Sequence, residues 1–169
     1  ADPNDTYRGF SPHTNLKTVL EQVKAGKFET RVVNGDLARL QGKPEDYVSF
    51  TNHPELLGDD VPLVITMGNH DHRENARKAI APIEGDVQPV EKKLVTVLDS
   101  GPVTFVMLDS LLATNVVPGQ LGKSQRAWLA SYLGTQTKPH VVFVHHNPDS
   151  ENDGGLVDAD KLLNLLQSH

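Results

Sequence analysis

Three short apolar segments of this sequence end abruptly in polar side chains that can bind metal ions. Residues 30–36 read TRVVNGD, residues 63–72 read LVITMGNHDH, and residues 140–146 read HVVFVHH. Short runs of β-branched and apolar residues are typical of buried strands. In an open α/β sheet, ligands collect where the strands reach their carboxyl ends. A fold that makes these strands neighbours would therefore bring their polar ends to one place.

The rest of the sequence alternates helical and extended patterns. Residues 93–110 contain two apolar runs around a Ser-Gly-Pro turn, which predicts a β-hairpin. Helices are expected from an N-cap at Asn15 to Gly26, over residues 73–81 up to Pro82, after a cap at Ser124, and from about Asp158. Together these elements predict an α/β fold with a mixed sheet, in a single domain spanning residues 1–169.

Composition narrows the classes of partner. The 169 residues carry a formal net charge of −6, and the 16 Lys and Arg are dispersed, so we expect no nucleic-acid polymer as partner. No apolar stretch is long enough to span a bilayer, so we expect no membrane contact. The chain has no cysteine, which agrees with a reducing compartment and favours a cytoplasmic location. The oligomeric state stays open.

The strand ends offer a defined set of metal ligands. If the three strands are neighbours, Asp36, Asn69 and His145 supply a carboxylate, an amide oxygen and an imidazole, a set that suits Mn²⁺, iron or Zn²⁺. A carboxylate can bridge two ions about 3.5–4 Å apart. Gly35 and Gly68 permit a sharp turn that aims the next side chain into the site. Each segment alone also fits a simple polar turn, but their shared position after a strand favours the metal site.

Three motifs carry a resemblance to a known family. The stretches VVNGDLA, MGNHDHR and VVFVHHNP resemble three of the five motifs of the calcineurin-like metallophosphoesterases. The stretches VMLDS and PGQLGKSQRAWLASYL are similar to the branch of class III cyclic-nucleotide phosphodiesterases and glycerophosphodiesterases. This resemblance covers most of residues 30–148. It implies a metallophosphoesterase-like four-layer αββα sandwich with mixed sheets.

The resemblance also implies a cofactor and its ligands. The family centre holds two divalent metal ions, here Mn²⁺, Fe²⁺/Fe³⁺ or Zn²⁺. By motif position, Asp36 would bridge the two ions, and Asn69 and His145 would hold the second. His146 could exchange roles with His145, but the family ligand precedes the Asn-Pro pair, which favours His145.

The same motifs imply roles in catalysis. The expected reaction is hydrolysis of a small phosphodiester, such as a 3',5'-cyclic nucleotide. His70 would stand beside the leaving oxygen and protonate it. Asp71 would orient either His70 or the adjacent turn. His72, Arg73 and His146 are candidate substrate-binding residues, since imidazole and guanidinium groups suit a phosphate.

Two family motifs are not found in the sequence. An Asp-x-His motif on a first strand and a Gly-His-x-His motif on a late strand are both missing. We therefore expect the domain to be incomplete at both ends, and this chain alone to bind metal weakly and to be inactive. Two alternatives stay open: a phosphomonoesterase or protein phosphatase with the same site, and a catalytically inactive scaffold. The retained His70 argues against the scaffold.

Overall fold

The computed structural model describes residues 6–26, 28–53, 61–80, 83–149 and 154–169. Within them the helices are α1 (Pro12–Ala25), α2 (Pro44–Thr51), α4 (Arg73–Ala79), α5 (Gly122–Leu133) and α6 (Ala159–Gln167). The strands are β1 (Arg31–Asn34), β2 (Leu63–Thr66), β3 (Asp86–Val87), β4 (Thr96–Asp99), β5 (Thr104–Met107) and β6 (His140–Phe143). No helix in these ranges has the length and apolar character needed to cross a membrane.

The strands form two sheets. In the first, β1 runs parallel to β2, with Asn34 opposite Thr66 at their carboxyl ends. The second has the order β3-β4-β5-β6, with β5 and β6 parallel and the other pairs antiparallel. The expected hairpin is confirmed as β4 and β5, and the second sheet is mixed, as the α/β prediction requires.

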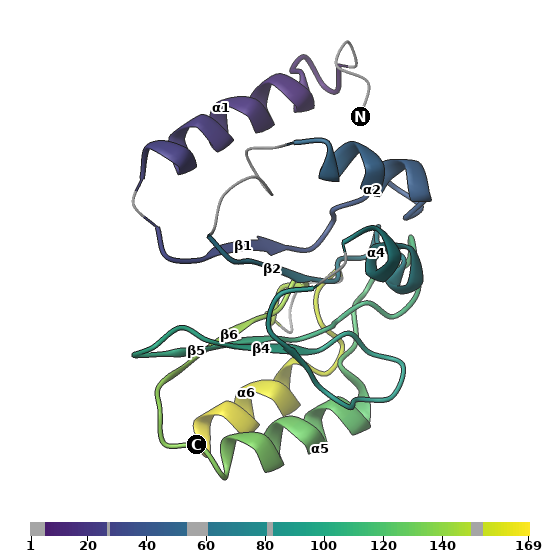
Figure 1. Ribbon diagram of the computed structural model, residues 1–169. Helices are drawn as coiled ribbons and strands as arrows, with labels where there is room; N and C mark the ends of the chain where they lie inside the picture. Colours follow the sequence, from purple (N-terminus) through teal and green to yellow (C-terminus); the bar gives the residue numbers. More distant parts are fainter. Residues whose placement is uncertain (1–5, 27, 54–60, 81–82, 150–153) are drawn as a thin grey trace.

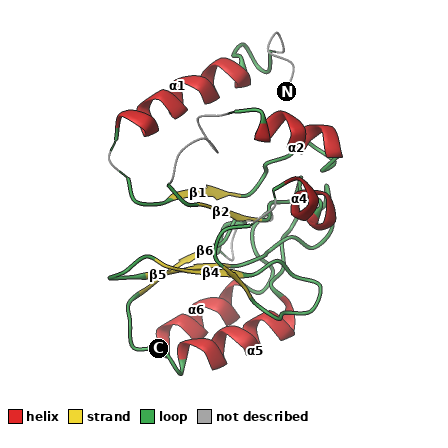
Figure 2. Cartoon of the chain, viewed as in Figure 1, coloured by secondary structure: helices red, strands yellow, loops and turns green. Residues whose placement is uncertain are grey.

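Helices cover the outer faces of both sheets. Figure 1 shows α1 and α2 over the first sheet and α5 and α6 over the second, which makes four layers in the order αββα. Figure 2 shows the same layers by secondary structure, with α4 beside the first sheet. The architecture implied by the family resemblance is therefore confirmed.

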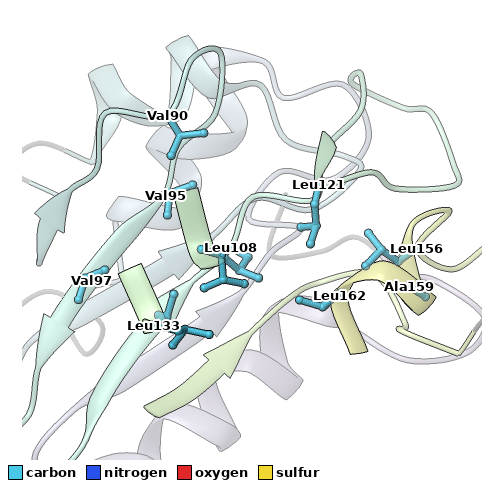
Figure 3. Packing of buried hydrophobic residues seen from close by; sticks show 11 residues of the cluster. Val90, Val95, Val97, Leu108, Leu121, Leu133, Leu156, Ala159 and Leu162 are labelled. Atoms are coloured by element: carbon cyan, nitrogen blue, oxygen red, sulfur yellow. The ribbon is translucent and has the colours of Figure 1, made fainter. Parts of the chain in front are cut away.

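The core follows from the periodicity of these elements. Beneath the second sheet, Val97 and Val106 pack with Leu129, Leu133 and Leu162 of α5 and α6, as Figure 3 shows in part. Each such side chain contributes about 1.5–3 kcal/mol when it is fully buried. The two leucines of α5 are buried, and Trp128 and Tyr132 pack partly buried against the same cluster.

A second cluster connects the first sheet to the segments around it. Ile65 and Met67 pack with Ala76 of α4 and with Leu94 and Leu111, which flank the strands of the second sheet. This cluster fixes the residues that follow β2, because Met67 is completely buried directly before Gly68. The polar segment 69–72 therefore starts from a rigid base.

Two predicted helix starts are wrong. The N-cap of α1 is Ser11, whose hydroxyl accepts from Thr14 N at 3.3 Å, and not Asn15, because Pro12 starts the helix earlier. Helix α5 starts at Gly122, before Ser124, because Asp158 accepts hydrogen bonds from Leu121 N and Gly122 N, both at 3.0 Å. A distant carboxylate thus replaces the local cap.

The other two predicted helices agree with the structure at their starts. Helix α6 begins directly after Asp158, as expected. Helix α4 begins at Arg73 but ends at Ala79, two residues earlier than expected. The predicted stop at Pro82 lies outside the described residues.

Replacing Asp158 by Ala should destabilise the fold by on the order of 3 kcal/mol. The carboxylate is 5% exposed, caps α5 and pairs with Arg126, so its loss leaves two backbone donors and a half-buried guanidinium without this partner. Urea unfolding measures the change. Asp160→Ala is the control, since Asp160 lies exposed in the first turn of α6, the helix that directly follows Asp158. Equal losses in both variants would contradict the capping role.

Candidate functional site

The site lies where the two sheets meet at the carboxyl ends of their strands. Asn34, the last residue of β1, donates from Nδ2 to Val144 O at 3.1 Å, just after β6 in the other sheet. Its Oδ1 accepts from Thr66 Oγ1 at 2.9 Å, at the end of β2. Its backbone oxygen accepts from His145 Nδ1 at 2.6 Å. One residue therefore connects the ends of all three strands that the sequence singled out.

Asp36 and His145 face each other across this junction. Asp36 Oδ1 lies 3.5 Å from His145 Nε2, with the side chains 34% and 19% exposed. Because His145 Nδ1 donates to a carbonyl, Nε2 of the neutral ring carries a lone pair. Two acceptor atoms then face each other, an arrangement that a shared cation stabilises. The donor chemistry of this pair fits a metal ion or a proton.

His70 and Asn69 complete the group on the β2 side. His70 N donates to Asp36 Oδ1 at 3.0 Å. Its Nδ1 donates to Leu40 O at 3.2 Å, so Nε2 is the acceptor in the neutral ring and lies 3.4 Å from Asn69 Nδ2. The structure thus brings together all four residues expected at the strand ends. Across the described ranges, however, no three His, Cys, Asp or Glu side chains are placed to hold a metal ion.

Two glycines give Asp36 and His145 their room. Gly35 has a φ of +81°, as the expected sharp turn requires, and a Cβ there would lie 2.4 Å from His145 Nδ1. Gly68 is required for a different reason, the close packing of Asp36: a Cβ at this position would lie 2.2 Å from Asp36 Oδ1 and 2.4 Å from Asp36 N. The first glycine serves the turn, and the second serves the close approach of Asp36 to the β2 loop.

Asp71 organises the turn and is not exposed at all. Its carboxylate accepts from Gly68 N at 2.9 Å, Ala38 N at 3.0 Å and Tyr47 Oη at 3.2 Å. Burial raises the pKa of Asp71, while these backbone donors oppose the rise. Of the two roles expected for Asp71, the contacts match support of the turn. Its catalytic assignment stays a prediction.

The candidate substrate-binding residues have protein partners. Arg73 donates from Nε and NH2 to the two oxygens of buried Asp109, at 2.6 and 2.9 Å. His146 is 4% exposed, its Nδ1 lies 2.7 Å from Ser110 Oγ, and burial lowers its pKa to about 4. His72 is the N-cap residue of α4, and its backbone N donates to Tyr47 Oη at 2.7 Å. The structure therefore gives Arg73 and His146 internal partners where a substrate was expected.

Sequence reasoning missed three residues that shape the site. Asn34 was given no role, although its side chain connects the sheets. Asp109 lies in the VMLDS stretch, which indicated the branch of the family, but Asp109 itself was given no role. Tyr47 gave no signal, because a single Tyr in a helix is most often a core residue. Position at or just beyond the carboxyl end of a strand was the signal that could have found the first two.

A cavity adjoins this group. It measures about 870 Å³, and its lining includes His72, Arg73 and Thr114. Its charged lining residues are Arg73, Arg77, Lys92, Lys93, Glu74 and Glu91, an excess of cations. The lining does not include Asp36, Asn69, His70 or His145: the cavity lies around the start of α4, and its lining residue Thr114 donates to Asp71 O, next to His70.

Comparisons with known proteins agree with the family resemblance of the sequence motifs. Residues 4–169 match the family model of the calcineurin-like phosphoesterases. A probable cyclic nucleotide phosphodiesterase of Synechococcus is 25% identical, over 99% of this chain and 64% of its own length. A probable glycerophosphodiester phosphodiesterase of Arcobacter nitrofigilis is 30% identical, over 69% of this chain and 41% of its own.

A cAMP/cGMP dual specificity phosphodiesterase of Mycobacterium tuberculosis is 27% identical, over 84% of this chain and 44% of its own length. The chain thus spans less than two thirds of each of these relatives. The branch suggested by the sequence motifs agrees with the names of these proteins.

Gly68→Ala should destabilise the protein by on the order of 2 kcal/mol, because the added methyl group overlaps Asp36. The same change should shift the amide NMR signal of His70, whose N–H donates to Asp36. Urea unfolding and a ¹⁵N correlation spectrum measure both effects. Gly134→Ala is the control, since Gly134 has a φ of −63° and a Cβ there would meet Ala130 O at 3.2 Å, a far smaller overlap than the 2.2 Å at Gly68. An unchanged His70 signal would contradict the steric argument.

Proposed function

The chain belongs to the calcineurin-like phosphoesterase family, and we propose that it provides the catalytic strand ends of a metal-dependent phosphodiesterase. The observation that carries the proposal is the pair Asp36 and His145, which face each other at 3.5 Å with His70 bonded to the same carboxylate oxygen. A scaffold without activity has no need of three such groups at one point, none of them buried.

The proposed metal centre uses Mn²⁺, iron or Zn²⁺. Asp36 Oδ1 and His145 Nε2 are the proposed ligands, with the Asn69 amide oxygen as a third. A bound divalent centre supplies positive charge to the ester oxygens and lowers the pKa of the attacking water. Asn34 O fixes the His145 ring through Nδ1, the usual way in which a protein orients a histidine ligand.

His70 is proposed to act on the leaving group. Its Nδ1 is held by Leu40 O, so Nε2 is the ring atom that remains to carry a proton to the departing oxygen. The backbone N of His70 is bonded to Asp36, so the ring keeps a fixed position relative to the proposed ligands. Positioning of this kind lowers the barrier by removing orientational freedom before the reaction.

Small phosphodiesters are the proposed substrates. The names of the matched relatives refer to cyclic nucleotides and to glycerophosphodiesters. The cavity beside α4 is large enough for an organic group of this size and has more cationic than acidic lining residues. We propose that it receives the part of the ester that lies away from the metal ions.

His70→Ala should lower kcat for an alkyl phosphodiester by about 10²–10⁴-fold and leave bound metal unchanged, because general acid catalysis contributes this much. The loss should shrink for bis(p-nitrophenyl) phosphate, whose leaving group departs without a proton. Asp36→Ala should instead remove metal and activity together, whatever the leaving group. The measurements are kcat with both substrates and metal content, on the full-length natural protein supplied with Mn²⁺.

Two outcomes would overturn these assignments. If the wild-type protein hydrolyses neither ester in Mn²⁺, the phosphodiesterase proposal fails. If His70→Ala removes the metal, or slows both substrates equally, His70 is a ligand or a phosphate-binding group and not the acid.

Arg77→Ala should raise KM for an anionic phosphodiester several-fold and leave kcat nearly unchanged, because it removes a cation from the cavity lining and not from the reacting centre. Lys78→Ala is the matched control, since Lys78 is an exposed cation on the same helix and is not among the lining residues. Steady-state kinetics at two salt concentrations measure both variants. Equal effects of the two changes would show that only long-range charge acts, and that the cavity is not the binding site.

A further inference from the structure

We propose that residues 109–115, here called the clamp segment, position the His70 turn against the His145 strand and so set the geometry of the leaving-group step. This inference rests on the proposed function. The segment follows β5 of the second sheet, whereas His70 follows β2 of the first. The clamp segment therefore follows the second sheet, whereas the turn that it contacts follows the first.

The segment is anchored at Asp109, which is completely buried. Besides the two bonds from Arg73, its carboxylate accepts from Leu94 N at 2.7 Å and Leu111 N at 3.0 Å. Its backbone N and O both bond the Gln125 side chain of α5, at 2.9 Å each. Charge-assisted bidentate bonds of the Arg73 type are strong and geometrically specific. Asp109 thus ties the start of α4 to the second sheet and to α5.

The far end of the segment holds the backbone on both sides of His70. Thr114 Oγ1 donates to Asp71 O at 2.7 Å, and Asn115 N donates to Asn69 O at 2.6 Å. With Arg73, the clamp segment holds three alternate residues around His70: residue 69 before it, and residues 71 and 73 after it. The ring of His70 itself contacts Leu40 O through Nδ1 and Asn69 Nδ2 through Nε2. The clamp segment therefore acts through the backbone of the turn and makes no ring contact of its own among the described hydrogen bonds.

The same segment also reaches the histidine strand. Ser110 Oγ lies 2.7 Å from His146 Nδ1 and accepts from His146 N at 3.4 Å. Ser110 is completely buried, so it is a support and not an exposed nucleophile. One continuous segment thus contacts the neighbours of both His70 and His145. A shift of the segment would change the distance between the proposed acid and the proposed ligands.

Thr114→Val tests this inference, because it removes one donor to the turn, nearly preserves side-chain shape, and leaves the buried Asp109 charge in place. Thr135→Val is the matched control: Thr135 Oγ1 also donates to a carbonyl, Tyr132 O at 2.8 Å, beyond the end of α5. The first measurement is amide hydrogen exchange of His70, whose N–H bonds Asp36. Exchange should rise on the order of fivefold in Thr114→Val and stay unchanged in Thr135→Val.

The second measurement is kcat of the full-length natural protein on the alkyl and aryl phosphodiesters. Thr114→Val should lower kcat for the alkyl ester by on the order of tenfold, lower it less for the aryl ester, and leave bound Mn²⁺ unchanged. A merely structural role would slow both esters equally. Unchanged His70 exchange, or equal slowing of the two esters, overturns the inference. If the wild-type protein is inactive on both esters, the proposed function fails, and the exchange result alone then decides whether the clamp segment fixes the turn.

Discussion

The contacts of Asn34 hold the two sheets together where the chemistry is proposed. Its side-chain amide donates to Val144 O, which follows β6 in the second sheet. Its backbone oxygen accepts a hydrogen bond from His145 Nδ1. Each sheet alone carries only part of the candidate site: Asp36 and His70 follow the first, and His145 follows the second. The distance between these parts is set by a few hydrogen bonds, because a sandwich of two sheets has no backbone ladder across its interior. Side-chain geometry at this junction therefore decides whether the site exists.

Local sequence pattern was sufficient for most of the strands and their polar ends, although it placed the start of α1 at Asn15, where Ser11 caps the helix. Short apolar runs identified β1, β2, β6 and the β4–β5 hairpin, and position after a strand identified Asp36, Asn69, His70 and His145. The misjudged helix start at Ser124 has a non-local cause, since the group that caps α5 is Asp158, 37 residues from Leu121. Arg73 shows the same limit. Its position directly after a motif expected to bind phosphate favours a contact with substrate. The observed partner of Arg73 is Asp109, which lies 36 residues away, so no local spacing in the sequence reveals the pair.

Burial separates the carboxylates into two kinds. Asp71, Asp109 and Asp158 are buried and surrounded by backbone donors, so their charge is balanced by the fold and serves to fix loops and helix ends. Asp36 is different: its side chain is 34% exposed, and one of its oxygens faces an imidazole nitrogen. A carboxylate that keeps solvent access at a strand end still has coordination capacity to offer a ligand. The environment, and not the residue type, distinguishes the candidate ligand from the structural acids.

The two adjacent histidines show how backbone geometry assigns different roles to identical neighbours. Both residues lie in a bend of the chain after β6, which ends at Phe143. The rings of His145 and His146 lie 5.0 Å apart with their planes at 85°. His145 turns toward Asp36 at the rim, whereas His146 turns inward to Ser110, where a Cβ on Gly119 would lie 2.3 Å from its ring. Burial lowers the pKa of His146, so the ring is neutral and serves as packing beside the clamp segment. The preference for His145 over His146 as a ligand stays a prediction, supported by the contact of His145 with Asp36 and of His146 with Ser110.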